Sequence, residues 1–237
     1  MKTNRTESRM YAVMGAIYES GIPIDFKGAM VLHALLYEHG YAYDAVRPTR
    51  DIDANWFSGE KPTMDTIQAA IQKAVRDHGI NLDVKPYRPF GDGQSAGLEF
   101  CDENTHLPVF TMDMDVNRPA TGTRIYHVDS FSFRGVIVEQ MLADKIFVIS
   151  TGKVFRRIKD VIDLYYLSHI VSLDENQVTQ VMKNAGRVPG NFECFLKQKS
   201  DLRHAYEKFR FGNTAIKPDL EMLYNTVAEY IQPFLPL

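Results

Sequence analysis

The chain carries the sequence RPTRDIDANW at residues 47–56, and its second half alternates between polar and apolar residues. The apolar positions are Ile52, Ala54 and Trp56, and the polar positions between them are Asp51, Asp53 and Asn55. Alternation with a period of two is typical of a β-strand that buries one face. We therefore expect a strand over residues 50–57 with both aspartates on the same face.

Two ionised carboxylates this close repel each other, so the pair is costly unless a cation lies between them. Mg²⁺ is commonly bound by one or two carboxylates together with substrate phosphates. Asp51 and Asp53 are therefore candidate ligands of Mg²⁺ or Mn²⁺. The competing interpretation is a solvated pair on an edge strand, or a pair that caps a turn.

A third carboxylate is available from the segment VFTMDMDV at residues 109–116, which also alternates. Phe110, Met112, Met114 and Val116 share one face, and Thr111, Asp113 and Asp115 share the other. A neighbouring strand with an aspartate would complete a two-metal clamp, in which one ion activates a hydroxyl and the other supports the leaving group. The pattern favours Asp113, with Asp115 as the alternate.

The segment before the aspartates has the order short strand, glycine, small residue and helix, with Gly28 and Ala29 at the turn. Backbone N–H groups at such a helix N-terminus form a site for phosphate. The alternative is an ordinary strand-to-helix turn. Arg47 and Arg50 flank the aspartates, and either suits a phosphate contact. Charge balance with the neighbouring aspartates is the alternative role, which we favour for Arg50.

The rest of the chain divides near residue 135. Helical periodicity predicts helices over residues 7–19, 30–38 and 63–78, the last with Thr63 as N-cap and Gly79 as stop. Residues 81–128 are β-rich. The segments 138–150, 156–168, 174–185, 192–211 and 218–232 are expected to be helical. We therefore expect an α/β domain at residues 1–135 and a helical domain at residues 136–237.

A second candidate cluster lies in ADKIFVISTGKVFRRIKDVIDLYYL, residues 143–167. Lys145 interrupts an apolar helix, where an uncompensated lysine is expensive to bury. In the functional interpretation, Lys145 binds the triphosphate and Asp160 orients the triphosphate or a neighbouring base. The alternative, which the spacing alone favours, is a helix stabilised by the i, i+4 ion pairs Arg156–Asp160 and Lys159–Asp163.

Composition limits the remaining possibilities. The formal net charge is −3 over 237 residues, so a polyanionic substrate must be met by a local basic patch. No apolar run reaches the roughly 20 residues of a membrane span, and the N-terminus does not resemble a signal peptide. Cys101 and Cys194 support neither a disulfide framework nor a zinc site. We expect a cytoplasmic protein without membrane association.

The segment 195–217 is rich in cations and aromatic residues. Such a mixture binds RNA through phosphate contacts and base stacking. A solvated helical face over an aromatic core is the competing interpretation. The residues concerned are Lys197, Lys199, Arg203, Lys208, Arg210 and Lys217, with Phe195, Tyr206, Phe209 and Phe211 between them.

The order and spacing of these motifs, over residues 24–168, resemble the AbiEii/AbiGii-type nucleotidyltransferases, many of which are toxins of bacterial toxin–antitoxin or abortive-infection systems. The resemblance implies an α+β fold of the DNA polymerase β-like superfamily: a mixed sheet with flanking helices, followed here by a C-terminal helical region. It also implies an NTP substrate, a tRNA or other RNA acceptor, and a cognate antitoxin.

By this resemblance, the glycine turn corresponds to Gly28 and Ala29, and the metal-binding aspartates to Asp51 and Asp53. The third strand aspartate corresponds to Asp113, and the later lysine and aspartate to Lys145 and Asp160. Supporting roles fall to Arg47, Thr49 and Asp163. Ala29 departs from the family pattern, in which glycine or serine follows the first glycine, so no serine hydroxyl is available for phosphate.

The leading hypothesis is transfer of a nucleoside monophosphate from an NTP to a hydroxyl acceptor. One alternative is the same transfer onto a small molecule, as in antibiotic-modifying enzymes. A second is a non-catalytic member of the fold that binds a protein partner. A metal-dependent nuclease would also use clustered aspartates but would not need the glycine turn.

Overall fold

The computed structural model describes residues 5–88, 96–116, 120–152, 157–212 and 217–236. The chain forms two compact units, and each is described by itself. The first contains residues up to Asp44 and Pro48–Val136, and the second contains Ala45–Arg47 and Ile137–Leu237. The division expected near residue 135 lies next to this limit, but the short segment Ala45–Arg47 groups with the helices. Whether the units are separate domains stays a prediction.

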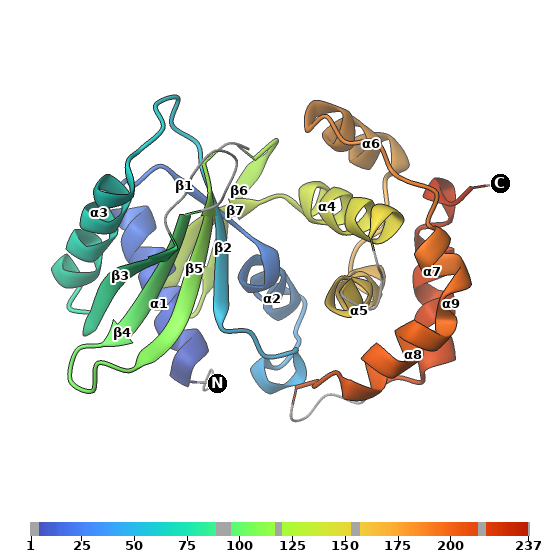
Figure 1. Cartoon of the computed structure of the whole chain (residues 1–237), viewed down its shortest axis with the longest axis horizontal. Helices are drawn as coiled ribbons and strands as arrows, with labels where there is room; N and C mark the ends of the chain where they lie inside the picture. Colours follow the sequence, from blue (N-terminus) through green and yellow to red (C-terminus); the bar gives the residue numbers. More distant parts are fainter. Residues whose placement is uncertain (1–4, 89–95, 117–119, 153–156, 213–216, 237) are drawn as a thin grey trace. The chain divides into compact units, whose positions relative to one another are not determined.

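A mixed sheet forms the centre of the first unit (Figure 1). Within the described residues it has seven strands in the order β3-β4-β5-β2-β1-β7-β6. The pairs β2–β5 and β1–β7 are parallel, and the other neighbours are antiparallel. The strands are β1 (Ile24–Lys27), β2 (Asp51–Trp56), β3 (Leu82–Arg88), β4 (Ala96–Asp102), β5 (Pro108–Asp115), β6 (Thr123–Val128) and β7 (Phe131–Val136).

The described residues of this unit form three α-helices: α1 (Arg5–Glu19), α2 (Gly28–Glu38) and α3 (Met64–Asp77). The short 3₁₀ turn η1 (Tyr43–Ala45) follows α2. Thr63 caps α3 as expected, because its hydroxyl accepts a hydrogen bond from the backbone N–H of Thr66 at 3.1 Å. Gly79 follows with a φ of +65°, a conformation that glycine adopts without strain.

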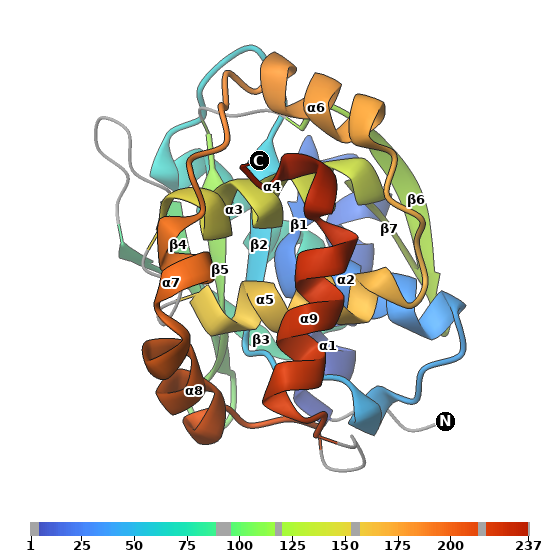
Figure 2. The ribbon, with the colours of Figure 1, turned by 90° about the vertical axis from the view of Figure 1, so that its right-hand side faces the viewer.

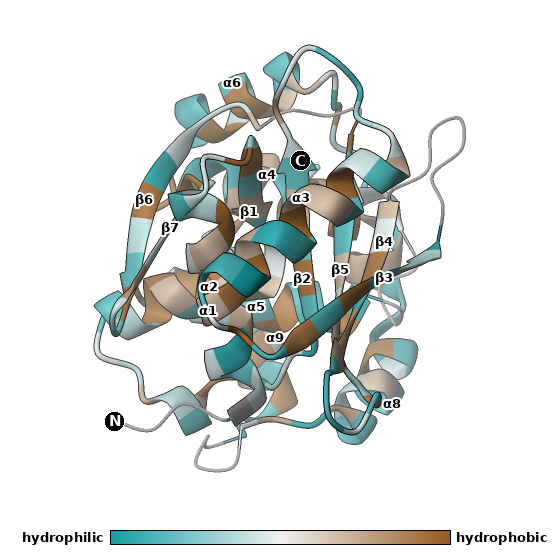
Figure 3. Cartoon of the chain, turned by 90° about the vertical axis from the view of Figure 1, so that its left-hand side faces the viewer, coloured by the Kyte–Doolittle hydropathy of each residue, from teal (hydrophilic) through white to brown (hydrophobic). Residues whose placement is uncertain are grey.

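The core of the unit lies against the apolar face of the sheet. Along β5, Phe110, Met112 and Met114 are buried while the residues between them are partly exposed. This alternation of hydropathy along the strands is visible in Figure 3. The Tyr11 ring of α1 stacks on Phe133 of β7 at 5.8 Å between centroids. Along β5 the expected period-two pattern therefore follows from one-sided burial, whereas on β2 the polar position Asn55 is buried as well.

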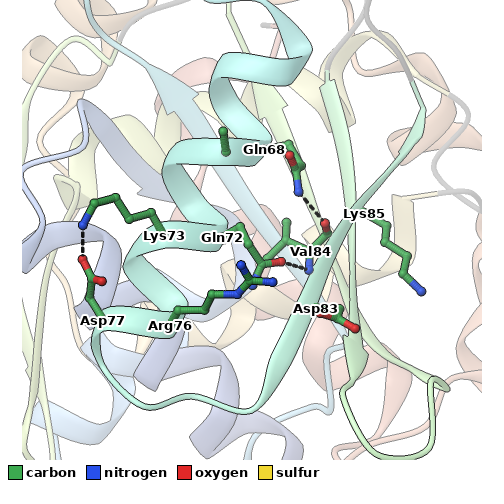
Figure 4. A pocket seen from close by; sticks show the side chains of 9 residues that line it. Gln68, Gln72, Lys73, Arg76, Asp77, Asp83, Val84 and Lys85 are labelled. Atoms are coloured by element: carbon green, nitrogen blue, oxygen red, sulfur yellow. Dashed lines mark hydrogen bonds and ion pairs between the residues drawn. The ribbon is translucent and has the colours of Figure 1, made fainter.

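The edge strand β3 is covered by side chains of α3 (Figure 4). The Gln72 amide donates to the Leu82 carbonyl at 3.1 Å and accepts from the Val84 N–H at 2.7 Å. Gln68 donates to the Val84 carbonyl at 2.9 Å. These contacts satisfy backbone groups that would otherwise attract another strand. They border an open hollow of about 590 Å³.

The second unit is helical in its described residues, with α5 and α9 packed against each other (Figure 2). Its α-helices are α4 (Val138–Thr151), α5 (Ile158–Ser168), α6 (Glu175–Asn184), α7 (Glu193–Lys197), α8 (Lys199–Lys208) and α9 (Leu220–Tyr230), and the 3₁₀ turn η3 (Gln232–Phe234) ends it. Asp174 and Asp219 cap α6 and α9 through their carboxylates. Among the described residues, every helix falls short of the length and apolarity that crossing a bilayer requires.

One expected helix is wrong in extent. Residues 192–211 form two helices rather than one, because the backbone at Gln198 leaves the helical region (φ −104°, ψ 48°). Glutamine is a good helix former, and neither glycine nor proline occurs within residues 192–211. The break therefore had no local signal.

Candidate functional site

The predicted aspartates of the first unit lie in neighbouring positions of the sheet. The parallel register of β2 and β5 pairs Asp51 with Thr111, Asp53 with Asp113 and Asn55 with Asp115. Paired residues of adjacent strands are about 4.8 Å apart and project from the same face. Asp51, Asp53 and Asp113 therefore share one patch on the polar face of the sheet.

Gly28 lies directly against the Asp53 carboxylate. Its φ is +70°, and a Cβ at this position would lie 2.2 Å from Asp53 Oδ2. Glycine is thus required both by the backbone conformation and by the close approach. The sequence predicts only that this turn binds phosphate. The structure shows that Gly28 also contacts the Asp53 side chain.

The helix α2 begins at this turn, with Lys27 as N-cap and no side-chain hydrogen bond to the first turn. Its first N–H groups carry the partial positive charge of a helix N-terminus. The Ala29 side chain is buried, so a contact of this residue with phosphate would use the backbone N–H. The absence of a serine hydroxyl removes one donor and leaves the turn intact.

Asp51 and Asp113 accept hydrogen bonds from neighbouring side chains. Thr111 donates its hydroxyl to Asp51 Oδ1 at 2.7 Å. Asp113 Oδ1 accepts from the Tyr87 hydroxyl and from the Arg88 guanidinium, both at 2.8 Å. Thr49 accepts from the Asp51 backbone N–H at 3.3 Å, so it supports the start of β2.

The donor atoms of this patch are carboxylate oxygens, the kind that Mg²⁺ prefers. In the described part of the chain, no three or more His, Cys, Asp or Glu side chains gather closely enough to hold a metal ion by themselves. Mg²⁺ sites, however, often use one or two carboxylates and complete the shell with substrate phosphates and water. The neighbours Asp53 and Asp113 fit that requirement. The assignment of Asp51, Asp53 and Asp113 as metal ligands stays a prediction.

Tyr87 and Arg88 were missed by the sequence interpretation. Both lie on β3, which is two strands away from β5 in the sheet, and neither belongs to a recognisable motif. The available signal was Pro86, because proline within a β-rich segment indicates an edge strand or a bulge. That signal does not say which side chains the irregularity redirects.

The second cluster lies in the helical unit and is centred on Asp163, which is fully buried on α5. Arg47 donates two hydrogen bonds to this carboxylate, from Nε to Oδ1 at 2.7 Å and from a terminal nitrogen to Oδ2 at 2.9 Å. Lys145 of α4 donates to Oδ2 at 2.6 Å. Lys145 Nζ also lies 3.6 Å from Asp160 Oδ1. Two cations and two carboxylates thus share one buried site.

Burial alone would raise the pKa of Asp163, but the charges and hydrogen bonds of Arg47 and Lys145 outweigh it and hold the pKa well below its usual range. The cost of burying Lys145 is offset in the same way. The expected i, i+4 pair between Lys159 and Asp163 is replaced by these two partners. Arg156, expected to pair with Asp160, lies outside the described residues.

In the described residues of the segment rich in cations and aromatic residues, the part up to Lys208 lies on the helices α7 and α8. Phe195 and Tyr206 are buried, so their rings are not available for base stacking. Arg203 pairs with Glu221 at 3.1 Å, and Lys197 pairs with Glu193 at 3.2 Å. This arrangement favours the solvated-face interpretation over an RNA-binding one.

Comparison with known proteins also indicates a nucleotidyltransferase. A family model described as the nucleotidyl transferase AbiEii toxin of type IV toxin–antitoxin systems matches residues 19–237. A comparison with curated protein sequences finds no match.

Solved structures that are similar to this chain include the following two. One is MenT4, a nucleotidyltransferase toxin from Mycobacterium tuberculosis H37Rv, with 12% identity, 95% of this chain and 81% of that chain covered, and a TM-score of 0.59. The other is an antigenic nucleotidyltransferase-like protein from Paracoccidioides brasiliensis, with 13% identity, 86% and 93% coverage, and a TM-score of 0.50. At these identities the likeness shows the fold, and the expected α+β nucleotidyltransferase fold class is confirmed.

Proposed function

The chain belongs to the AbiEii family of nucleotidyltransferase toxins, and from this we propose that it transfers a nucleoside monophosphate from a magnesium-bound NTP to a hydroxyl of an RNA acceptor. One observation carries the proposal. Asp53 is in register with Asp113 on the neighbouring strand and is also in contact with Gly28 at the start of α2. Asp53 therefore belongs to the candidate metal site and also lies against the candidate phosphate-binding turn.

The carboxylates Asp51, Asp53 and Asp113 would hold the divalent ion, Mg²⁺ or Mn²⁺. Such an ion, when bound, lowers the pKa of the acceptor hydroxyl and supports the leaving pyrophosphate. Accepting the hydroxyl proton is the alternative role for Asp113, whose side chain is about one-third exposed. Asp115, on the same face, is the alternate third carboxylate.

Gly28 and Ala29 would bind the triphosphate through their backbone N–H groups. These groups begin an α-helix of 11 residues that has no side-chain cap, so its positive end is suited to an anion. We assign Thr49 a supporting role, since it hydrogen-bonds the backbone of Asp51. The substrate phosphates would in turn complete the coordination shell of the metal.

We also propose that Lys145 and Asp160 of the helical unit contribute to substrate binding, with Lys145 neutralising charge that develops on the leaving group. The hydrogen bond from Lys145 to Asp163 supports this, because it fixes the ammonium in one position before substrate arrives. Arg47 donates to the same Asp163 carboxylate and would help to keep that carboxylate, and so Lys145, in place.

The direct test is incubation of the protein with radiolabelled NTPs, Mg²⁺ and total cellular RNA. Asp53→Asn should abolish the labelling while the melting temperature stays near that of the wild type. Asp65→Asn, an exposed aspartate at the start of α3, is the matched control and should retain labelling. Undiminished labelling by Asp53→Asn would contradict the assignment.

The acceptor is tested in the same assay by separating labelled RNA from labelled small molecules. Label on tRNA-sized RNA supports the RNA acceptor, whereas label on an added aminoglycoside would favour small-molecule transfer. A protein that binds no NTP in calorimetry with Mg²⁺ would instead be a non-catalytic binder.

The family context supports a cognate antitoxin as partner. In a cell that expresses the chain, growth arrest that is relieved by the neighbouring open reading frame would support this proposal. Growth arrest that also occurs with Asp53→Asn would show that the toxicity does not depend on nucleotide transfer.

A further inference from the structure

We propose that Tyr87 and Arg88 are positioning residues for Asp113, which hold one carboxylate oxygen so that the other is presented to the divalent ion. This inference rests on the function proposed above. Both donors reach the same atom, Asp113 Oδ1, at 2.8 Å. Neither of them uses Oδ2, the oxygen that the proposal assigns to the metal.

A row of residues crosses the sheet at the level of the site. The register pairs Lys27 with Asp53, Asp53 with Asp113, Asp113 with Gly97, and Gly97 with Arg88. The two carboxylates are neighbours, so they repel each other in the absence of a cation. Arg88 supplies a positive charge from the far side of Asp113, and only a glycine lies between them in the row.

The irregularity of β3 explains how two consecutive residues reach one carboxylate. In a regular strand, successive side chains project from opposite faces. The pairing of β3 with β4 shifts between Pro86 and Arg88, where Pro86 opposes Leu98 and Arg88 opposes Gly97. Such a bulge adds a residue and redirects a side chain, and bulges are frequent next to active sites. Tyr87 and Arg88 are both brought to Asp113 in this way.

Gly97 provides the space for the Tyr87 ring. A Cβ on Gly97 would lie 2.7 Å from Cε1 of Tyr87 and 2.9 Å from Cβ of Arg88. The aromatic ring therefore lies against the backbone of β4, beside the position paired with Asp113. Any larger residue would displace the ring and its hydroxyl.

Hydrogen-bond partners of metal-binding carboxylates orient them, and their loss typically lowers metal affinity about 10- to 100-fold. We expect Arg88→Met to raise the Kd for Mn²⁺ within that range. Tyr87→Phe removes only the hydroxyl and should give a smaller increase. Gly97→Ala should act like Tyr87→Phe by moving the ring, and Arg88→Lys should partly restore the affinity.

The experiment is a titration of the full chain with Mn²⁺, followed by electron paramagnetic resonance, in the presence of a non-hydrolysable NTP analogue. Arg124→Met is the matched control, because Arg124 also binds one carboxylate, that of Glu38, at 2.6 Å with similar side-chain exposure (39% against 43% for Arg88). It should leave the Kd for Mn²⁺ unchanged. Melting temperatures establish that each variant is folded.

The outcomes separate the two proposals. If the wild-type protein binds no Mn²⁺ with the analogue, the proposed function fails and this inference falls with it. If the wild type binds and Arg88→Met binds equally or more tightly, the inference alone is overturned, because Arg88 would then be a bystander or a competitor of the metal.

Discussion

At the scale of single residues, Gly28 satisfies two requirements at once. Its backbone has a φ of +70°, and its missing side chain leaves room for Asp53. Neither Lys27 before it nor Ala29 after it has a positive φ, so the turn depends on this one glycine. A substitution here should therefore affect both stability and the site.

We expect Gly28→Ala to lower the free energy of unfolding by about 1–3 kcal/mol and to reduce nucleotide transfer strongly. Gly21→Ala is the matched control, because Gly21 has a φ of +68° with nothing within 4 Å of an added Cβ. It should show the backbone cost of roughly 1 kcal/mol without loss of transfer. Urea unfolding and the labelling assay measure the two effects, and equal effects of the two variants on transfer would contradict the close-approach argument.

At the scale of elements, Asp163 links α5 to α4 through Lys145 and to the segment Ala45–Arg47 through Arg47. Removing the charge of this buried carboxylate takes away the anion to which both Arg47 and Lys145 donate, and Asp160, 3.6 Å from Lys145, offsets only part of their charge. We expect Asp163→Asn to lower the free energy of unfolding by about 3–5 kcal/mol near pH 7, measured by urea unfolding. A loss below about 1 kcal/mol would contradict a structural role for this cluster.

The same cluster predicts a pH dependence. Because the folded-state pKa of Asp163 lies below its unfolded value, its contribution is fully present above an unfolded pKa of about 4 and is lost as the pH falls towards the folded pKa. The free energy of unfolding should therefore fall with acidification below about pH 4. This slope should be smaller in Asp163→Asn, and identical slopes in the two proteins would count against the assignment.

The start of α3 depends on Thr63, whose hydroxyl accepts from the Thr66 N–H. Thr63→Ala should destabilise the first unit by about 1 kcal/mol, whereas Thr63→Ser should retain the cap. Thermal unfolding of the two variants in parallel measures the difference. Similar melting temperatures for Ala and Ser at this position would show that the cap contributes little.

At the scale of the whole molecule, a ligand that binds only the folded chain raises its stability by mass action. An NTP at about 100 times its Kd should stabilise the protein by roughly 2.7 kcal/mol in the presence of Mg²⁺. A chelator, or the Asp53→Asn substitution, should remove this stabilisation. A rise in melting temperature that survives the chelator would indicate nucleotide binding without the metal.

Much of the first unit followed from local patterns. The alternation of residues 50–57 and 109–116 predicted β2 and β5, and it assigned Asp51, Asp53 and Asp113 to the polar face before any contact was known. Thr63 and Gly79 marked the limits of α3. These signals are local because strand and helix periodicity depend on the backbone of a few consecutive residues.

The amino-acid sequence alone determined most of the helices, the strands β2 and β5, and the face of these strands that carries the carboxylates, because one-sided burial imposes a period on neighbouring residues. Tertiary structure alone decided that Asp53 and Asp113 are partners, that Asp163 binds Arg47 and Lys145 instead of Lys159, and that Tyr87 and Arg88 reach Asp113. Those contacts join residues far apart in the chain, and they depend on strand register, on a bulge and on buried charge balance, none of which leaves a periodic trace in the sequence.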